Sequence, residues 1–344
     1  MKKYFLYVFL LLPFIGSSQN TSLLNSLKDS IKLNASKMIR ADFDDAQKNA
    51  YSDKVGYYVN KFIKQEKSIN YNMDSLKLVK VLTSDNKRIR IFTWAIPLSN
   101  NQFLFKGIVQ SYVKSNKSYK TIKLTDKSAH MSRAYNKSLT PKKWYGAYYY
   151  KIIQTKRGSR YFYTLLGWKG IDRTKQSKVI EVLVARNNGD ITFGYNLFKI
   201  KGYEYFEKTP SVKRLIFVYS AKGSMFLDYD YQTIIVKTKK KSKPKKRPRS
   251  NAGFGAQQKL EQPKEKIKTI KDNLIVMDRL EPTSPEVSEF YDFYFPESNI
   301  IDALRFERNA WKYYPDIDAR NKPNPNDKKP KNINYNLTPD EEED

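Results

Sequence analysis

Residues 144–168 read WYGAYYYKIIQTKRGSRYFYTLLGW, and this stretch decides the class of fold. Two aromatic-rich runs, 144–153 and 160–168, flank the link TKRG, whose glycine suits a tight turn. Side chains alternate in the first run, with Trp144, Tyr148 and Tyr150 on one face and Tyr145 and Tyr149 on the other. We therefore predict an antiparallel hairpin with one aromatic face in the core; the other face either offers a platform to a ligand or pairs with aromatics of neighbouring strands.

The same period of two continues on both sides of this hairpin. Runs rich in β-branched and aromatic residues are predicted strands at 76–82, 88–96, 103–113, 119–124, 178–185, 191–200, 214–220, 224–236, 272–280, 289–295 and 302–314. Links such as RNNGD and AKG carry turn-forming residues, and no helical crossover separates the runs. The sequence therefore predicts a mainly β fold, a large antiparallel meander that closes into a barrel-like or sandwich form.

The N-terminal part of the chain has a different character. It opens MKKYFLYVFLLLPFIGSSQN, with two lysines, an apolar stretch too short for a bilayer span, and small residues at its end. This order is typical of a secretory signal peptide over residues 1–18. We therefore expect an exported protein, periplasmic or extracellular, with no transmembrane span after signal removal. Residues 19–70 carry apolar side chains at helical spacing, which predicts two N-terminal helices.

The net charge of +29 is distributed unevenly. Residues 71–236 carry 30 basic and 10 acidic groups, so the body of the protein is the main basic region. The basic run KTKKKSKPKKRPR occupies residues 237–249. It begins a stretch, 237–271, that lacks strand or helix periodicity, and we predict that this stretch is a disordered basic insertion. The last strands of the β domain are expected at 272–320, and a disordered tail at 321–344. One β domain is thus interrupted by one loop.

Several segments resemble an uncharacterised family of exported β-rich proteins from Bacteroidota. They are RIFTWAIPL (90–98), LTDKS (124–128), WYGAYYYKI (144–152), YTLLGW (163–168), KVIEVL (178–183), FVYSAKGSMFLDYD (217–230) and IVMDRLEP (275–282). The similarity extends from residue 40 to residue 320 and lies in the order and spacing of the segments. It implies export and a β fold, with no established activity. The chain departs from the family where Lys169 replaces an acidic residue and Arg279 replaces a histidine.

The composition leaves few candidates for catalysis. The chain has no Cys, so it has no thiol nucleophile, and its one His, His130, lies in the polar stretch DKSAHMSR. These residues do not support a serine triad or a usual zinc shell. We expect no metal site, no cofactor and no catalytic residue. The alternative is a glycan-active hydrolase in which Glu181, inside the apolar strand KVIEVLVA, works with an Asp. The opposing interpretation pairs Glu181 with a Lys or Arg of the sheet.

Binding is the class of function that the composition favours. The chain has 26 Tyr, 19 Phe and 4 Trp beside many cations, and such surfaces stack sugar rings and attract anions, although aromatics also fill β cores. We predict a noncatalytic envelope protein that binds an anionic glycan, a lipid head group or a protein; a structural subunit of an envelope complex is a further alternative. Export excludes intracellular nucleic acid as a partner.

Two sets of residues are candidates for contact with such a partner. The candidate ligand surface comprises Trp94, Tyr149, Trp168, Lys169 and Arg186. The candidate polyanion-binding arm comprises Lys239, Lys240, Lys241, Lys245, Lys246, Arg247 and Arg249.

Overall fold

The computed structural model describes residues 5–66, 68–206, 212–239 and 265–317. The chain divides into two units. The first comprises residues 1–231 and 273–317, and the second comprises residues 232–272 and 318–344. The sites described below all lie in the first unit.

Two helices begin the described chain, α1 (Phe5–Met38) and α2 (Asp45–Ile63). A capping box starts α2: the Asp44 side chain accepts a hydrogen bond from the Gln47 amide (2.7 Å), and the Gln47 side chain accepts one from the Asp44 amide (3.1 Å). This confirms the two predicted N-terminal helices. α1 passes through residue 18 without a break, so cleavage there stays a prediction. Within the described ranges, no helix combines the length and apolar character needed to cross a bilayer.

The described strands form three sheets. The first has the order β1 (Lys80–Thr83), β2 (Ile89–Pro97), β3 (Phe103–Val113) and β4 (Ser118–Thr125). The second has the order β10 (Arg214–Ser220), β7 (Lys175–Ala185), β6 (Arg160–Gly170) and β5 (Tyr148–Arg157), with β8 (Ile191–Phe193) also paired to β7. The third has the order β11 (Leu227–Lys239), β12 (Glu265–Pro282), β13 (Tyr294–Glu307), β14 (Ala310–Tyr314) and β9 (Phe198–Lys199).

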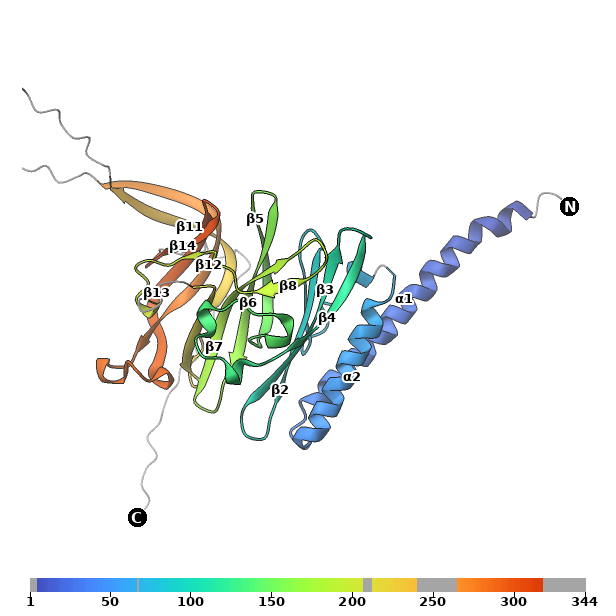
Figure 1. The fold of residues 1–344 in the computed structure, drawn as a ribbon, viewed down its shortest axis with the longest axis horizontal. Helices are drawn as coiled ribbons and strands as arrows, with labels where there is room; N and C mark the ends of the chain where they lie inside the picture. Colours follow the sequence, from blue (N-terminus) through green and yellow to red (C-terminus); the bar gives the residue numbers. More distant parts are fainter. Residues whose placement is uncertain (1–4, 67, 207–211, 240–264, 318–344) are drawn as a thin grey trace, which may run out of the picture. The chain divides into compact units, whose positions relative to one another are not determined.

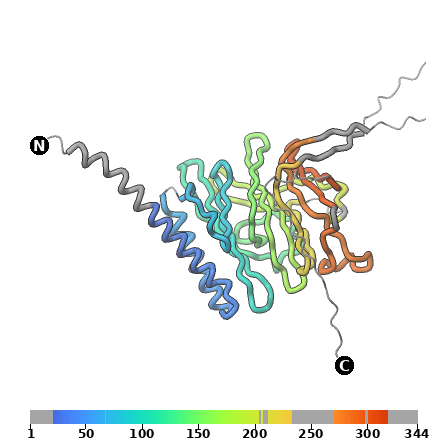
Figure 2. Tube along the Cα trace, turned by 180° about the vertical axis from the view of Figure 1, so that it is seen from behind, coloured from blue at the N-terminus to red at the C-terminus, as the bar shows by residue number. Residues whose placement is uncertain are grey.

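The first unit is stacked in layers, and Figures 1 and 2 show their order from opposite sides. The helices cover one face of the first sheet, where Val55 and Val59 of α2 pack in one cluster with Phe92 of β2. Ile89 and Ile91 of the same strand point to the other face and join the cluster shared with the second sheet. β2 is thus buried on both faces.

The second and third sheets share another core. Leu166 of β6 and Ile180 of β7 pack there with Ile275 of β12, and Trp311 of β14 donates a hydrogen bond from its indole to Thr164 Oγ1 (3.0 Å). The mainly β fold is therefore confirmed, and the core shared by the second and third sheets is consistent with a sandwich-like arrangement. Among the described strands, no sheet closes into a barrel.

Three local features differ from the sequence prediction. β9 pairs in parallel with β14, whereas we expected antiparallel pairing throughout. β11 continues to Lys239 and β12 begins at Glu265, so strand enters both ends of the range 237–271 that we expected to be disordered; a backbone ladder needs no alternation of side chains. The core of that range, residues 240–264, lies outside the described residues, as does the predicted tail.

The hairpin that decided the fold is present, with a corrected face assignment. β5 begins at Tyr148, and its register against β6 shifts between Tyr149 and Lys151. Trp144 therefore lies before the strand and packs in the same cluster as Tyr149, not on the opposite face. The run 302–314 is a hairpin, not one strand: Arg308 and Asn309 both have positive φ, as a two-residue hairpin turn between β13 and β14 requires.

Candidate functional site

A pocket of about 370 Å³ lies where the first sheet meets the second. Backbone hydrogen bonds fix its edges: the Lys114 amide donates to the Asn187 carbonyl (2.8 Å), and the Tyr112 amide donates to the Arg88 carbonyl (2.8 Å). We call it the arginine–tyrosine pocket. Its lining comprises Arg88, Tyr112, Lys114, Ser159, Arg160, Tyr161, Tyr163, Ala185, Arg186 and Asn187.

Four cations line this pocket, namely Arg88, Lys114, Arg160 and Arg186. They come from four separate places in the chain: the turn before β2, the end of β3, the start of β6 and the turn after β7. No lining residue is acidic, and within the described part of the chain none of the four forms a salt bridge. Four positive charges without a salt bridge around one concavity produce a positive potential that favours an anionic ligand.

Tyrosine rings position the most enclosed of these cations. The Arg88 guanidinium carbon lies 5.9 Å from the ring centre of Tyr112 and 5.6 Å from that of Tyr161. A guanidinium held between two rings loses less freedom when it binds a carboxylate, sulfate or phosphate in bidentate fashion. Tyr163, buried behind it, exchanges hydrogen bonds with Asn86, and burial raises the pKa of the Tyr163 hydroxyl. The pocket is therefore preorganised, with a neutral phenol behind the cations.

The carboxylate nearest to Arg186 is already engaged. Asp190 accepts a hydrogen bond from Lys120 Nζ at 2.6 Å, and this contact, with a smaller contribution from Arg186, lowers the pKa of Asp190. Gly189, with φ of +79°, shapes the same turn: a Cβ there would lie 2.8 Å from Val113 Cγ2. The turn after β7 can thus approach β3 closely only because residue 189 is glycine.

The residues of the candidate ligand surface do not form one exposed surface. Trp94 is 3% exposed, and its indole donates to Ser52 Oγ (2.8 Å) beneath α2. Tyr149 is fully buried, and Lys169 is buried beside Asp126. Trp168 is half-buried against Phe103, and Arg186 alone reaches the arginine–tyrosine pocket. The reason is that both faces of β2, β5 and β6 are covered by other layers, which strand alternation alone does not reveal.

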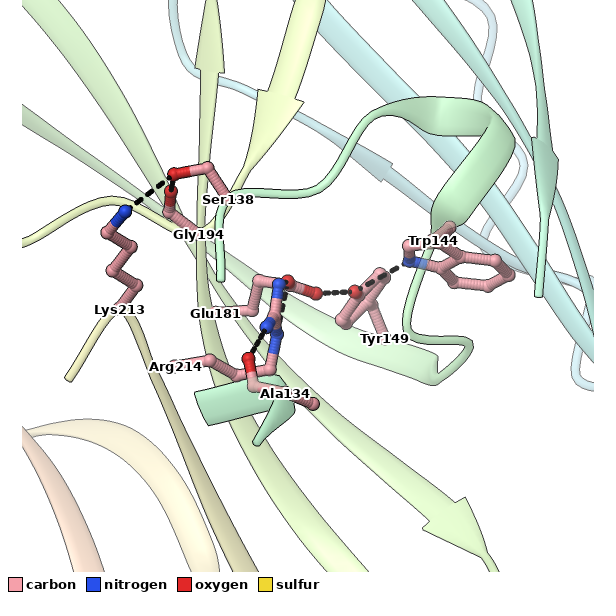
Figure 3. Close-up of polar contacts among 8 residues, drawn as sticks. All are labelled: Ala134, Ser138, Trp144, Tyr149, Glu181, Gly194, Lys213 and Arg214. Carbon is pink, nitrogen blue, oxygen red and sulfur yellow. Dashed lines mark hydrogen bonds and ion pairs between the residues drawn. The ribbon is translucent and has the colours of Figure 1, made fainter. Parts of the chain in front are cut away.

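Glu181 lies in a separate, buried cluster (Figure 3). It is a direct cross-strand partner of Arg214, and both side chains are fully buried. One carboxylate oxygen accepts from Arg214 Nε and the other accepts from the Tyr149 hydroxyl. Trp144 Nε1 donates to the same hydroxyl at 2.9 Å, and Arg214 Nη1 donates to the Ala134 carbonyl. The carboxylate is therefore neutralised and hydrogen-bonded from both sides.

This arrangement confirms the ion-pair interpretation of Glu181 and removes the support for the hydrolase alternative. A glycosidase needs two carboxyl groups that both face a substrate. Glu181 has no exposed surface, and the nearby Asp126 is occupied by Lys169 Nζ at 3.3 Å. The exposed His130 lies in a short turn at Ser128–His130. Among the described residues, no group of three or more His, Cys, Asp or Glu side chains is placed to hold a metal ion.

Comparisons of the chain with protein-family models, with curated proteins and with solved structures find no match. The function must therefore be argued from the site itself. In the candidate arm, Lys239 ends β11, and the other six residues lie outside the described ranges.

Sequence analysis missed three of the four cations of the arginine–tyrosine pocket. Arg88, Lys114 and Arg160 are separated from one another by tens of residues and belong to no local motif. One signal was present in the sequence: each lies within two residues of a predicted hairpin turn, and turns at one end of stacked sheets come together. Only the pairing of the strands determines which turns meet.

Proposed function

We propose that the protein is an exported, noncatalytic binding protein that takes an anionic glycan in the arginine–tyrosine pocket. The observation that carries the proposal is the meeting of four unpaired cations with three tyrosine rings in one concavity. Cations select carboxylate or sulfate substituents, and tyrosine faces stack on sugar rings. Export is supported by the sequence of residues 1–18, which has the order of a signal peptide.

The size of the pocket favours a glycan over the other partner classes. A concavity of about 370 Å³ fits the lower range of small-ligand sites, whereas a protein partner needs a broad contact surface. A phosphoglycerol or phosphoethanolamine head group would supply an anion but no ring to stack on Tyr112 or Tyr161. The favoured ligand is therefore a short segment of an acidic polysaccharide.

Isothermal titration with a heparin disaccharide, and with neutral cellobiose as the matched uncharged ligand, tests this proposal. We expect the heparin disaccharide to bind, its affinity to fall steeply with salt, and cellobiose to bind far more weakly. The double variant Arg160→Gln/Arg186→Gln removes two charge-assisted contacts and should lower the affinity by about tenfold or more.

The matched control is Lys142→Gln/Lys222→Gln, which removes the same charge from two exposed lysines outside the pocket. This control should retain nearly the full affinity. Equal losses in the two double variants would mean that net charge, not the pocket, holds the ligand. If the protein binds anionic lipid vesicles or a co-purified envelope protein but does not bind the disaccharide, the glycan proposal is wrong and that partner is the ligand.

A further inference from the structure

A cavity of about 700 Å³ lies beside β10 and the ends of β3 and β6. We call it the Ile216 cavity. Its apolar wall includes Phe103, Met131, Ile171, Ile216 and Val218, and each of these side chains is only half-buried. Ile216 and Val218 alternate along β10 with the fully buried Leu215 and Phe217. Both faces of this strand are thus apolar, and one of them remains partly open to solvent.

The wall of this cavity is fixed in place. The Phe103 ring packs edge-on against Trp168 at 5.1 Å, and it lies over Gly170, where a Cβ would come within 2.3 Å of its Cδ2 atom. On another side, the Ala134 carbonyl is held by the buried Arg214 guanidinium. The opening between these walls therefore does not close by a simple rotation of side chains, and an apolar ligand would enter a preformed space.

Two cations border the cavity, and in the described part of the chain only one of them is paired with a carboxylate. Lys169, buried in the wall, has its Nζ 3.3 Å from Asp126 Oδ2 and 4.3 Å from the Phe105 ring centre, so its charge is compensated. Arg133 is exposed at the rim, and within the described residues it has no ion pair. Arg133 also has a left-handed backbone with φ of 50° at the start of a 3-10 turn. The carboxylate that lines the cavity, Asp172, is paired with Lys175 at 3.5 Å, so the free charge beside the apolar wall is that of Arg133.

We propose that the Ile216 cavity binds a free long-chain carboxylic acid, with the chain on the wall formed by Phe103, Ile216 and Val218 and the carboxylate at Arg133. Charge complementarity selects the head group, because Arg133 is the uncompensated cation at the rim. The half-buried apolar side chains select the tail, since a hydrocarbon chain removes them from water. This site shares no lining residue with the arginine–tyrosine pocket, so it stands apart from the proposed glycan binding.

Titration calorimetry of the full chain with dodecanoate, dodecanol and butyrate below their aggregation limits tests both parts of the proposal. We expect dodecanoate to bind with a negative heat-capacity change, which marks the burial of apolar surface. The wild type should bind dodecanol, which lacks the charge, about tenfold more weakly than dodecanoate. The variant Arg133→Gln should bind dodecanoate about tenfold more weakly than the wild type does, because a charge-assisted contact is lost. Butyrate, which lacks the tail, should give no measurable heat.

Variants that fill the cavity separate this site from adventitious binding to a basic surface. Ile216→Trp and Met131→Trp each place a large ring in the space, and either should abolish dodecanoate binding while thermal melting confirms folding. If one variant fails to fold, the other decides. The arginine–tyrosine pocket variant Arg160→Gln/Arg186→Gln serves as the control and should bind dodecanoate normally. Three results would overturn the proposal. They are unchanged dodecanoate binding in a folded Trp variant, equal affinities for dodecanoate and dodecanol, and binding only to phospholipid vesicles.

Discussion

Glu181 of β7 and Arg214 of β10 are direct partners across the ladder that joins these strands, and the fully buried carboxylate and guanidinium contact each other. Both side chains are fully buried within the second sheet, out of contact with bulk solvent. The Tyr149 hydroxyl donates to Glu181, and the Ala134 carbonyl accepts from Arg214. A buried pair of this kind costs desolvation energy that its own attraction approximately offsets, so its main effect appears when one partner is lost.

The first prediction follows from that balance. Arg214→Leu leaves the Glu181 carboxylate buried without a counter-charge and should lower the free energy of unfolding by about 3–5 kcal/mol. The double variant Glu181→Leu/Arg214→Leu removes both charges and should recover a large part of this loss. Urea denaturation of the single variants and the double variant gives the coupling energy. Additive losses would show that the two side chains act independently, against the contact seen here.

A second prediction concerns Gly194, which lies beside the same pair. Its φ is +83°, and a Cβ there would come within 2.5 Å of the Lys137 carbonyl oxygen and 3.2 Å of Arg214 Nη2. The Gly194 carbonyl also accepts a hydrogen bond from Ser138 Oγ at 3.0 Å, as Figure 3 shows. Gly194→Ala should therefore combine left-handed strain with a steric clash and destabilise the fold by about 2–5 kcal/mol.

Gly202 provides the matched control for this change. Its φ is also +83°, but no heavy atom lies within 4 Å of the position of a Cβ. Gly202→Ala should therefore cost only the backbone strain, about 1–2 kcal/mol. The difference between the two variants in chemical denaturation isolates the steric cost at Gly194. Equal losses at both positions would mean that the Lys137 segment moves aside freely.

The third prediction concerns pH and the buried Lys169. Burial lowers the pKa of Lys169, and the neighbouring Asp126 acts in the opposite direction and raises it. Because its pKa is lowered, Lys169 binds a proton more weakly in the folded protein than in the unfolded chain. The free energy of unfolding therefore rises as pH increases from the lowered pKa of the folded state to the ordinary lysine pKa of the unfolded chain. Asp126→Asn removes the opposing effect and should make this rise larger and start at a lower pH.

Melting temperatures of the wild type and of Asp126→Asn, measured from about pH 7 to about pH 10, test this expectation, because most other titrations cancel in the difference. The variant should gain more stability than the wild type as pH increases. Parallel curves would show that Asp126 does not set the protonation of Lys169.

The fourth prediction concerns the N-terminus. Among the described side chains of α1, the core residues begin at Leu24 and continue through Leu27 to Met38. Removal of residues 1–18 by a signal peptidase would therefore keep the cluster that α1 forms with α2 and the first sheet. A chain that begins at Gln19 should unfold at the same denaturant concentration as the full chain, and N-terminal sequencing of exported protein should start near that residue. A full-length N-terminus in the exported protein would rule out the cleavage.

Sequence patterns predicted those parts of the fold that depend on neighbouring residues. The predicted strand 88–96 is β2, and of the two interpretations of Glu181 the ion pair is confirmed. The parallel pairing of β9 with β14 was not predictable in this way, because it joins Phe198 to Trp311 across more than a hundred residues. The arginine–tyrosine pocket was missed for the same reason: strand pairing, not local composition, brings its residues together.

The last prediction separates geometry from charge at that pocket. Arg88→Lys keeps the net charge of +29 and the cation, but it replaces a planar guanidinium held between Tyr112 and Tyr161 by a single ammonium. An ammonium cannot form the paired, coplanar hydrogen bonds that a carboxylate or sulfate accepts from arginine. The affinity for the heparin disaccharide should therefore fall by about tenfold, while elution from a cation exchanger, which reports overall charge, stays unchanged. An Arg→Lys change at the exposed Arg173, outside this pocket, is the matched control and should alter neither measurement. If Arg88→Lys binds the disaccharide as well as the wild type, the pocket acts only as a positive surface, and the stacked arginine has no part in recognition.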